Sequence, residues 1–300
     1  SRIMSTKIIS TADLRAHQTP LQVLDVRLAD DFEASHLPGA VNNCVFEVAF
    51  ADRLAHSAPE REAPVVVYGA SASSHESRIA AGKLERLGYT TILDYREGLS
   101  GWLEAGNTAE TGAPLPSLPA LPSGRIEIDL GESRVEWVGR NLLNKHFGQV
   151  GLRSGHLDFE EGRVVGGEFV VDLKDMHCTD LEGEMHDVLI AHLQNDDFFD
   201  VGRFPEARYR ILSSETIHDA NPSGPNLRLD GEFTLRGETH PLTIEAFSGL
   251  SPDGKPAAQA VLALDRTVWG SIYGSARFFH RLGMHLVSDL VHLQLRIVGR

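Results

Sequence analysis

The hydrophobic pattern of the chain changes at a proline-rich segment, residues 106–124. Before this segment, short apolar runs alternate with stretches whose apolar residues have helical spacing. After it, apolar and polar residues alternate with a period of two. The segment contains four prolines, which favour an extended spacer. Because 300 residues also exceed one typical core, the sequence predicts two domains, residues 1–105 and 125–300, joined by a linker at 106–124.

Strands and helices alternate through residues 1–105. Runs that contain valine, leucine, isoleucine or threonine at residues 21–27, 64–68 and 90–93 predict strands. Ser10 and Asp13 have the spacing of a capping box, which predicts a helix that begins there. Strands that alternate with helices in this way favour an α/β fold with a parallel sheet covered on both faces.

Residues 64–78 predict a strand, a turn of small residues and a helix. Such a turn directs backbone N–H groups and the positive end of the helix dipole toward one point, which favours an anion. Enzymes that use this arrangement for group transfer place a thiol beside it, because the same field stabilises the thiolate. Gly69 occupies that position here. On this reasoning, Gly69→Cys is expected to create an activated thiol.

Four motifs in the first domain together resemble a single rhodanese domain. They are residues 24–27 (LDVR), 36–42 (HLPGAVN), 64–68 (PVVVY) and 94–102 (DYREGLSGW). The resemblance implies that the residue after the PVVVY strand is the cysteine that carries a persulfide sulfur, and this residue is glycine. A degenerate rhodanese-like domain without a catalytic residue is therefore expected. Its degenerate loop comprises Gly69, Ala70, Ser71, Ala72, Ser73 and Ser74.

Two alternatives would make the first domain an enzyme. Cys44 could replace the missing nucleophile in a sulfurtransferase, although a lone cysteine among apolar residues is usually a small core residue. Ser71, Ser73 or Ser74 could serve an anion hydrolase with His75 as the base. No acidic residue is identifiable in the sequence to orient His75, and serine-rich turns are common without catalysis.

The second domain has the pattern of an antiparallel β-structure. Turn residues at 161–162, 222–224, 236–237 and 252–254 separate its alternating stretches, and only residues 182–193 have helical spacing. A long meander of this kind favours a closed barrel, because closure removes exposed sheet edges. We expect the inward residues of this alternation to line an apolar tunnel. The residues that alternate with polar ones in the clearest strands are Ile126, Ile128, Leu130, Leu157, Phe159, Ala207, Tyr209, Ile211, Leu227, Leu229, Gly231, Phe233, Leu235, Val291, Leu293, Leu295 and Ile297.

Three ordered motifs in this domain resemble the YceI-like family. They are residues 192–201 (HLQNDDFFDV), 204–207 (FPEA) and 231–237 (GEFTLRG). The resemblance implies a lipocalin-like barrel that binds a polyisoprenoid or a fatty-acyl lipid and that needs no cofactor. It also implies, by analogy, a homodimer.

The candidate ligand-binding residues of the barrel are aromatic, because an apolar ligand needs an apolar wall. They are Trp137, Phe147, Phe159, Phe169, Phe198, Phe199, Trp269, Phe278 and Phe279. Since successive strand residues face opposite sides, one ring of each adjacent phenylalanine pair is expected to point away from the interior. Fourteen histidines raise the question of a metal, but none has the spacing of a zinc motif, so no metal site is expected.

Composition limits the partners and the compartment. The net charge is −14 and neither half of the chain is basic, so nucleic acid is not an expected partner. No apolar run is long enough to span a membrane, and no signal peptide is recognisable. With only Cys44 and Cys178 present, a disulfide framework is not expected. These features favour the cytoplasm, or the periplasm if the chain is a mature form.

Overall fold

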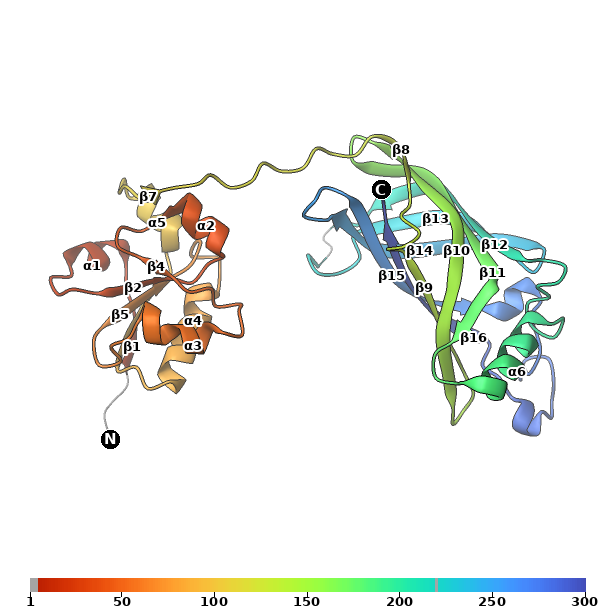
Figure 1. Ribbon diagram of the computed structural model, residues 1–300. Coiled ribbons are helices and arrows are strands. Elements are labelled where there is room, and N and C mark those ends of the chain that lie inside the picture. Colours follow the sequence, from red (N-terminus) through yellow and green to blue (C-terminus); the bar gives the residue numbers. More distant parts are fainter. Residues whose placement is uncertain (1–4, 219–220) are drawn as a thin grey trace. The chain divides into compact units, whose positions relative to one another are not determined.

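A computed structural model describes residues 5–218 and 221–300, and it divides the chain into two compact units (Figure 1). The first unit covers residues 1–117 and the second residues 118–300. The first is an α/β unit with a parallel sheet and the second is an antiparallel barrel, which confirms the fold class predicted from the sequence.

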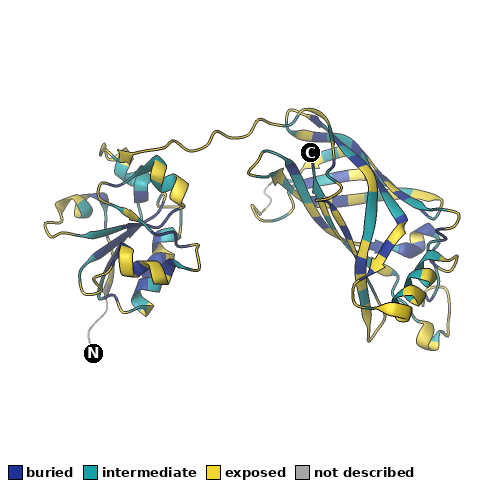
Figure 2. Ribbon diagram, viewed as in Figure 1, coloured by how far each residue is buried: buried dark blue, intermediate teal, exposed yellow. Residues whose placement is uncertain are grey.

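The first unit is built on five parallel strands. In spatial order they are β1 (Ser5–Ile8), β6 (Thr91–Tyr95), β5 (Val65–Tyr68), β2 (Gln22–Asp25) and β4 (Val41–Asn42). All four residues of the central strand β5 are fully buried, so the sheet is covered on both faces (Figure 2). Continuous burial is what a central parallel strand requires, and it explains the unbroken apolar run of its sequence.

Five helices cover this sheet: α1 (Thr11–Ala16), α2 (Ala29–Ala34), α3 (Phe50–Ser57), α4 (Glu76–Arg86) and α5 (Gly98–Glu104). Residues of α3 and α4 pack on one side with Leu24 and Val67, whereas Leu14 of α1 and Trp102 of α5 pack on the other. The expected capping box is present: Ser10 Oγ accepts from the Asp13 N–H, and Asp13 Oδ2 accepts from the Ser10 N–H.

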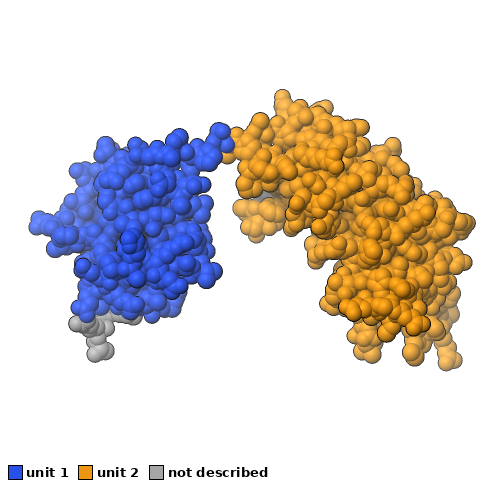
Figure 3. Space-filling model, in the orientation of Figure 1, with its two compact units in different colours: residues 1–117 blue, residues 118–300 orange. Residues whose placement is uncertain are grey.

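Part of the expected linker is folded onto the units that it joins. Strand β7 (Glu110–Thr111) pairs antiparallel with β3 (Ser35–His36), and His36 Nε2 lies 3.0 Å from Glu110 Oε2. At the other end, the Gly162 N–H of the barrel donates to Pro122 O at 2.9 Å. The two units meet in sequence at residues 117 and 118 (Figure 3).

The second unit is an eight-stranded barrel in which every neighbouring pair is antiparallel. Strands β11 to β16 follow one another, β16 pairs with β9, β9 pairs with β10, and β10 pairs back with β11 to close the sheet. A short ninth strand, β8 (Gly124–Glu127), adds to the second half of β10. The barrel strands are β9 (Arg134–Arg140), β10 (Lys145–Glu160), β11 (Arg163–Cys178), β12 (Glu206–Thr216), β13 (Leu227–Leu235), β14 (Glu238–Leu250), β15 (Pro256–Asp265) and β16 (Leu290–Val298).

Each barrel strand alternates between residues that face inward and residues that face solvent (Figure 2). The turns between β10 and β11, β12 and β13, and β14 and β15 lie at one end of the barrel, which we call the turn end. At the turn between β10 and β11, Glu161 and Gly162 both have positive φ, which permits a two-residue hairpin.

The opposite end, which we call the helix end, carries the chain segments that leave the barrel. Helix α6 (Gly183–Gln194) lies between β11 and β12, one residue away from the expected range 182–193. Between β15 and β16 the chain forms two short 3-10 helices, η1 (Arg266–Trp269) and η2 (Gly283–His285). No helix in the described part of the chain has the length and apolar character to cross a membrane.

Candidate functional site

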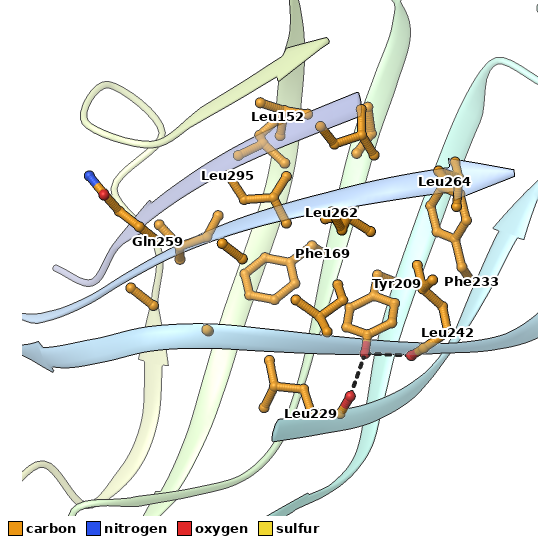
Figure 4. Close-up of a pocket in the computed structure, with 18 of the residues that line it drawn as sticks. Leu152, Phe169, Tyr209, Leu229, Phe233, Leu242, Gln259, Leu262, Leu264 and Leu295 are labelled. Carbon is orange, nitrogen blue, oxygen red and sulfur yellow. Dashed lines mark hydrogen bonds between the residues drawn. The ribbon is translucent and has the colours of Figure 1, made fainter. Parts of the chain in front are cut away.

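The interior of the barrel contains a cavity of about 640 Å³. Its wall is formed almost entirely by aliphatic and aromatic side chains from all eight barrel strands, as Figure 4 shows for part of the lining. Leu229, Leu262 and Leu295 come from three different strands and converge on the same space. A volume of this size lies within the range of cavities that bind small organic ligands.

The alternating pattern of the strands creates this wall. On β15, Ala258, Ala260 and Leu262 line the cavity, whereas Val261 between them is 70% exposed. The two alanines are shorter than the leucines of neighbouring strands, so they leave space where larger residues would fill the interior. The empty interior therefore depends on the small size of these inward side chains as well as on the alternation of inward and outward residues along each strand.

Tyr209 brings the polar tip of its side chain into this apolar interior. Its hydroxyl donates to Leu242 O at 2.9 Å and lies 3.4 Å from Leu229 O (Figure 4). Gly231 makes room for the ring, because a β-carbon there would lie 2.6 Å from the tyrosine hydroxyl. Burial raises the pKa of Tyr209, so the side chain stays neutral and its hydrogen bond is made within the wall.

The turn end of the cavity is polar at its rim and is crossed by the linker. Glu161, Arg163 and Asn226 line the cavity at this end, where they follow or precede strands β10, β11 and β13. Leu121 of the linker also lines it and lies over Gly162. At this end the cavity therefore changes from an apolar wall to a rim of polar and charged side chains, and the Leu121 side chain lies at the same rim.

At the helix end the cavity is lined by Leu193, Phe198 and Phe199 together with a buried arginine. Arg266 is 1% exposed, and its guanidinium donates to Ser271 O at 2.6 Å, Tyr273 O at 2.6 Å, Ser288 O at 3.1 Å and Val287 O at 3.2 Å. The guanidinium carbon lies 5.3 Å from the centre of the Phe198 ring. Desolvation lowers the pKa of Arg266, while the four carbonyl oxygens solvate its charge.

Five of the nine aromatic residues proposed from the sequence line the cavity: Trp137, Phe159, Phe169, Phe198 and Phe199. Phe198 and Phe199 both line it because they lie in a turn after α6, where the alternation of a strand does not apply. The expectation that one of these two rings points away was therefore wrong.

The other four aromatic residues do not line the cavity. Phe147 is partly exposed near the start of β10. Trp269 is buried in the wall, where its indole N–H donates to Phe233 O at 2.9 Å. Phe278 and Phe279 are exposed in the segment between η1 and η2. Aromatic character alone does not identify a lining residue, because the direction of each ring depends on its element.

In the first unit, the loop between β5 and α4 is held by hydrogen bonds that backbone N–H groups of α5 donate to the loop's carbonyls. Gly69 O accepts from the Leu99 N–H at 3.1 Å, and Ala70 O accepts from the Ser100 N–H at 2.9 Å. Glu76, the first residue of α4, turns its carboxylate toward Gly69. Glu76 Oε2 is buried and has no hydrogen-bond partner among the described residues. The space beside the glycine is therefore occupied by an acidic side chain.

The candidate residues for alternative chemistry are not assembled into a catalytic group. Cys44 is buried. The hydroxyls of Ser71 and Ser73 lie 3.0 Å apart, and His75 is exposed at the start of α4 without a capping bond. Among the described residues, the His75 ring has no hydrogen bond or ion pair with a carboxylate, so the Ser–His–acid geometry of a hydrolase is not present there.

A buried network next to this loop has a structural role. Asp25 Oδ2 accepts from the Tyr68 hydroxyl at 2.6 Å and from Arg27 Nη2 at 2.7 Å. Arg27 Nη2 also donates to Ser35 O at 2.6 Å, and the Tyr68 oxygen accepts from the Leu37 N–H at 3.0 Å. The LDVR motif therefore ties the end of β2 to β5 and to the loop that follows α2.

Comparison with known proteins assigns both units. A family model described as a YceI-like domain matches residues 127–299, more than half of the chain. The chain belongs to the YceI-like family. A second model, described as a rhodanese-like domain, matches residues 10–105. Both family resemblances drawn from the sequence motifs are thereby confirmed.

Individual relatives of this YceI-like chain are distant. A UPF0312 protein of Vibrio parahaemolyticus is 28% identical over 123 residues, which cover 40% of this chain and 58% of that protein. The similarity thus spans less than two thirds of the curated relative. Burkholderia cenocepacia BcnA is 18% identical, with a TM-score of 0.46 over 58% of this chain and 99% of that one. A polyisoprenoid binding domain from Saccharophagus degradans is 13% identical, with a TM-score of 0.43 over 60% and 99%.

The aromatic candidates form only part of the lining of this YceI-like barrel. The aliphatic lining residues, such as Leu229, Leu262 and Leu295, outnumber the aromatic ones. The period-two pattern already identified Leu229 and Leu295 as alternating residues, but the sequence analysis did not single them out as ligand-binding residues. Arg266 carries no comparable signal, because nothing in a lone arginine of the sequence predicts complete burial.

Proposed function

We propose that this protein binds an amphiphilic lipid of the polyisoprenoid or fatty-acyl type inside its barrel. The observation that carries this proposal is the continuous apolar cavity of about 640 Å³. Apolar surface of this extent is unfavourable in contact with water, and an acyl or prenyl chain would remove it from water. Membership of the YceI-like family makes a polyisoprenoid the first candidate.

The two ends of the cavity suggest how such a ligand is oriented. A polar head group needs hydrogen-bond partners or water, because its burial without them is costly. The turn end supplies Glu161, Arg163 and Asn226 at the rim, whereas the helix end is lined by the apolar rings of Phe198 and Phe199. The ligand therefore enters with its apolar tail toward the helix end and keeps its head group at the rim.

The rhodanese-like domain has no sulfur-transfer activity in this proposal. The position that the family resemblance assigns to the nucleophile is Gly69, and the space beside it holds the Glu76 carboxylate. A carboxylate at that point repels anions such as thiosulfate. Cys44 is buried and cannot replace the missing thiol without a rearrangement.

The principal test is the identity and amount of lipid that co-purifies with the full chain. We expect organic extraction and mass spectrometry to yield a long-chain isoprenoid or acyl species. Leu262→Trp fills the cavity and should reduce recovered lipid and the uptake of a fluorescent fatty acid at least tenfold. Val261→Trp, which adds the same bulk on the outer face of the same strand, should bind as the parent does. Equal loss in both variants, or no lipid and no uptake in the folded parent, would contradict the proposal.

Two further parts of the proposal concern the first domain and the partners. Thiosulfate:cyanide sulfurtransferase activity should be no higher than the uncatalysed background, and turnover that disappears in Cys44→Ser would contradict this.

With a net charge of −14, the chain should not retain nucleic acid. A homodimer, expected by analogy, is tested by light scattering of the purified chain.

A further inference from the structure

Three side chains with metal-binding atoms meet at the helix end of strands β10 and β11. Gly148 of β10 pairs with Cys178, the last residue of β11, and the Thr179 N–H donates to Phe147 O at 2.7 Å. This pairing places His146 opposite Asp180. Asp180 lies two residues beyond the end of β11, and its carboxylate turns back toward β10, where the Phe147 N–H donates to Asp180 Oδ1 at 2.9 Å.

The polar atoms of the three residues are in contact. His146 Nδ1 lies 2.9 Å from Asp180 Oδ2, and Cys178 Sγ donates to Asp180 Oδ1 at 3.1 Å. The His146 nitrogen, the Cys178 sulfur and an Asp180 oxygen all lie within 4.8 Å of one another. Three ligands around one small ion are separated by distances of this order, so the group needs little movement to surround a metal.

The burial of the three residues matches a site that an ion can enter from solvent. Cys178 is 5% exposed and packs with the barrel core that contains Trp137 and Met176. The side chains of His146 and Asp180 are 40% and 22% exposed. The Cys178 sulfur is thus on the buried side of the cluster, while the His146 imidazole and the Asp180 carboxylate are on the side that faces solvent.

We propose that His146, Cys178 and Asp180 form a binding site for a divalent transition-metal ion, with Zn²⁺ as the best match. An imidazole nitrogen, a thiolate and a carboxylate are the three ligand types that Zn²⁺ uses in proteins, and three protein ligands leave the fourth tetrahedral position for water. The mixed set disfavours Ca²⁺ and Mg²⁺, which require oxygen ligands.

The surroundings of the cluster support this assignment. The hydrogen bond from the Phe147 N–H to Asp180 Oδ1 holds the carboxylate in position beside His146 and Cys178. The Cys178 N–H donates to His186 Nε2 at 3.2 Å, which joins the cluster to helix α6. Binding of an ion here would fasten the ends of β10 and β11 to the segment that leads into α6.

The sequence analysis expected no metal site, since His146 and Cys178 are far apart in the chain. Zinc motifs are recognised from ligands close together on one turn or helix. Here the antiparallel pairing of two long strands brings the ligands together. This site is independent of the lipid cavity, because none of its three residues lines the cavity.

Co²⁺ added to the reduced, metal-free full-length chain tests the proposal, because a thiolate ligand produces a near-ultraviolet charge-transfer band. We expect about one Co²⁺ per folded chain, displaced by Zn²⁺. Cys178→Ser should abolish the band, and His146→Gln should weaken Co²⁺ binding at least tenfold, as loss of a ligand exceeds typical changes in outer contacts. Circular dichroism confirms that each variant is folded.

Two matched controls are available in the same chain. Cys44→Ser removes the other buried thiol, and His177→Gln removes a histidine next to Cys178 that is outside the cluster. Both should bind Co²⁺ as the parent does. Absence of the thiolate band in the folded parent, or unchanged binding in His146→Gln, would overturn the proposal, whichever way the lipid experiments turn out.

Discussion

The carboxylate of Glu76 occupies the space in which a side chain at residue 69 would lie. A β-carbon built on Gly69 would be 2.5 Å from Glu76 Oε2, 3.0 Å from its carboxyl carbon and 3.1 Å from its β-carbon. Glycine at 69 and glutamate at 76 are thus sterically matched. Any side chain introduced at residue 69 would therefore have to displace the Glu76 carboxylate.

Gly69→Cys should consequently give a thiol with a pKa above the ordinary value of ~8.5, because the adjacent carboxylate opposes a thiolate. This differs from the activated thiol that the sequence alone suggested. In Gly69→Cys/Glu76→Ala the pKa should fall below that value, since the N-terminus of α4 then acts without the opposing charge. Alkylation rate against pH measures both, with the parent chain as the blank. Identical pKa values in the two variants would show that Glu76 does not control this position.

Leu121→Ala should speed the release of bound lipid, because Leu121 lies across the turn end of the cavity. Loss of about 1 kcal/mol of apolar contact corresponds to roughly a fivefold faster dissociation. Leu118→Ala is the matched control, since Leu118 is 93% exposed and does not line the cavity. Stopped-flow transfer of a fluorescent fatty acid to vesicles measures the rate. Equal rates in all three proteins would show that the linker does not retain the ligand.

Arg266→Met should destabilise the barrel by about 2–5 kcal/mol, because it leaves buried carbonyl groups without donors. These carbonyls belong to Ser271, Tyr273, Val287 and Ser288, which the arginine holds together at the helix end. Calorimetry of the full chain should show a lower melting temperature for the barrel and an unchanged transition for the first unit. Unaltered barrel stability would mean that water replaces the guanidinium without cost.

The barrel should lose stability above about pH 10 because of Tyr209. Burial raises its pKa in the folded state, so the folded barrel favours the protonated form. This contribution is fully present below the unfolded pKa of ~10 and is lost as the pH rises toward the folded value. Tyr209→Phe should flatten this alkaline decline in urea unfolding, at a cost of about 1 kcal/mol near neutral pH for the lost hydrogen bond. Tyr68→Phe, in the other unit, should leave the barrel's alkaline decline intact.

Local patterns predicted the elements and their assembly into two folds. The capping box at Ser10 and Asp13 was identified from four residues, and helix α6 was placed to within one residue. Both succeed because capping and helical periodicity depend on neighbours in sequence. The alternation of Leu227, Leu229 and Leu235 likewise identified the inner face of β13, since strand geometry alone sends alternate residues to opposite sides.

Features that depend on distant pairs were decided only in three dimensions. Phe278 and Phe279 lie outside the cavity, although they are as aromatic as Phe198 and Phe199, because they belong to a segment that leaves the barrel. His146 meets Cys178 and Asp180 through the register of β10 and β11, and Glu76 meets Gly69 across the loop between β5 and α4.

The sequence by itself thus determined the fold of each unit, the apolar character of the barrel interior and the absence of a thiol at residue 69. The tertiary structure decided which residues line the cavity, that a carboxylate stands beside Gly69, and that three separated side chains share one site. The physical reason is that backbone periodicity is a local property, whereas cavities and ligand clusters depend on the direction and size of side chains from several elements at once.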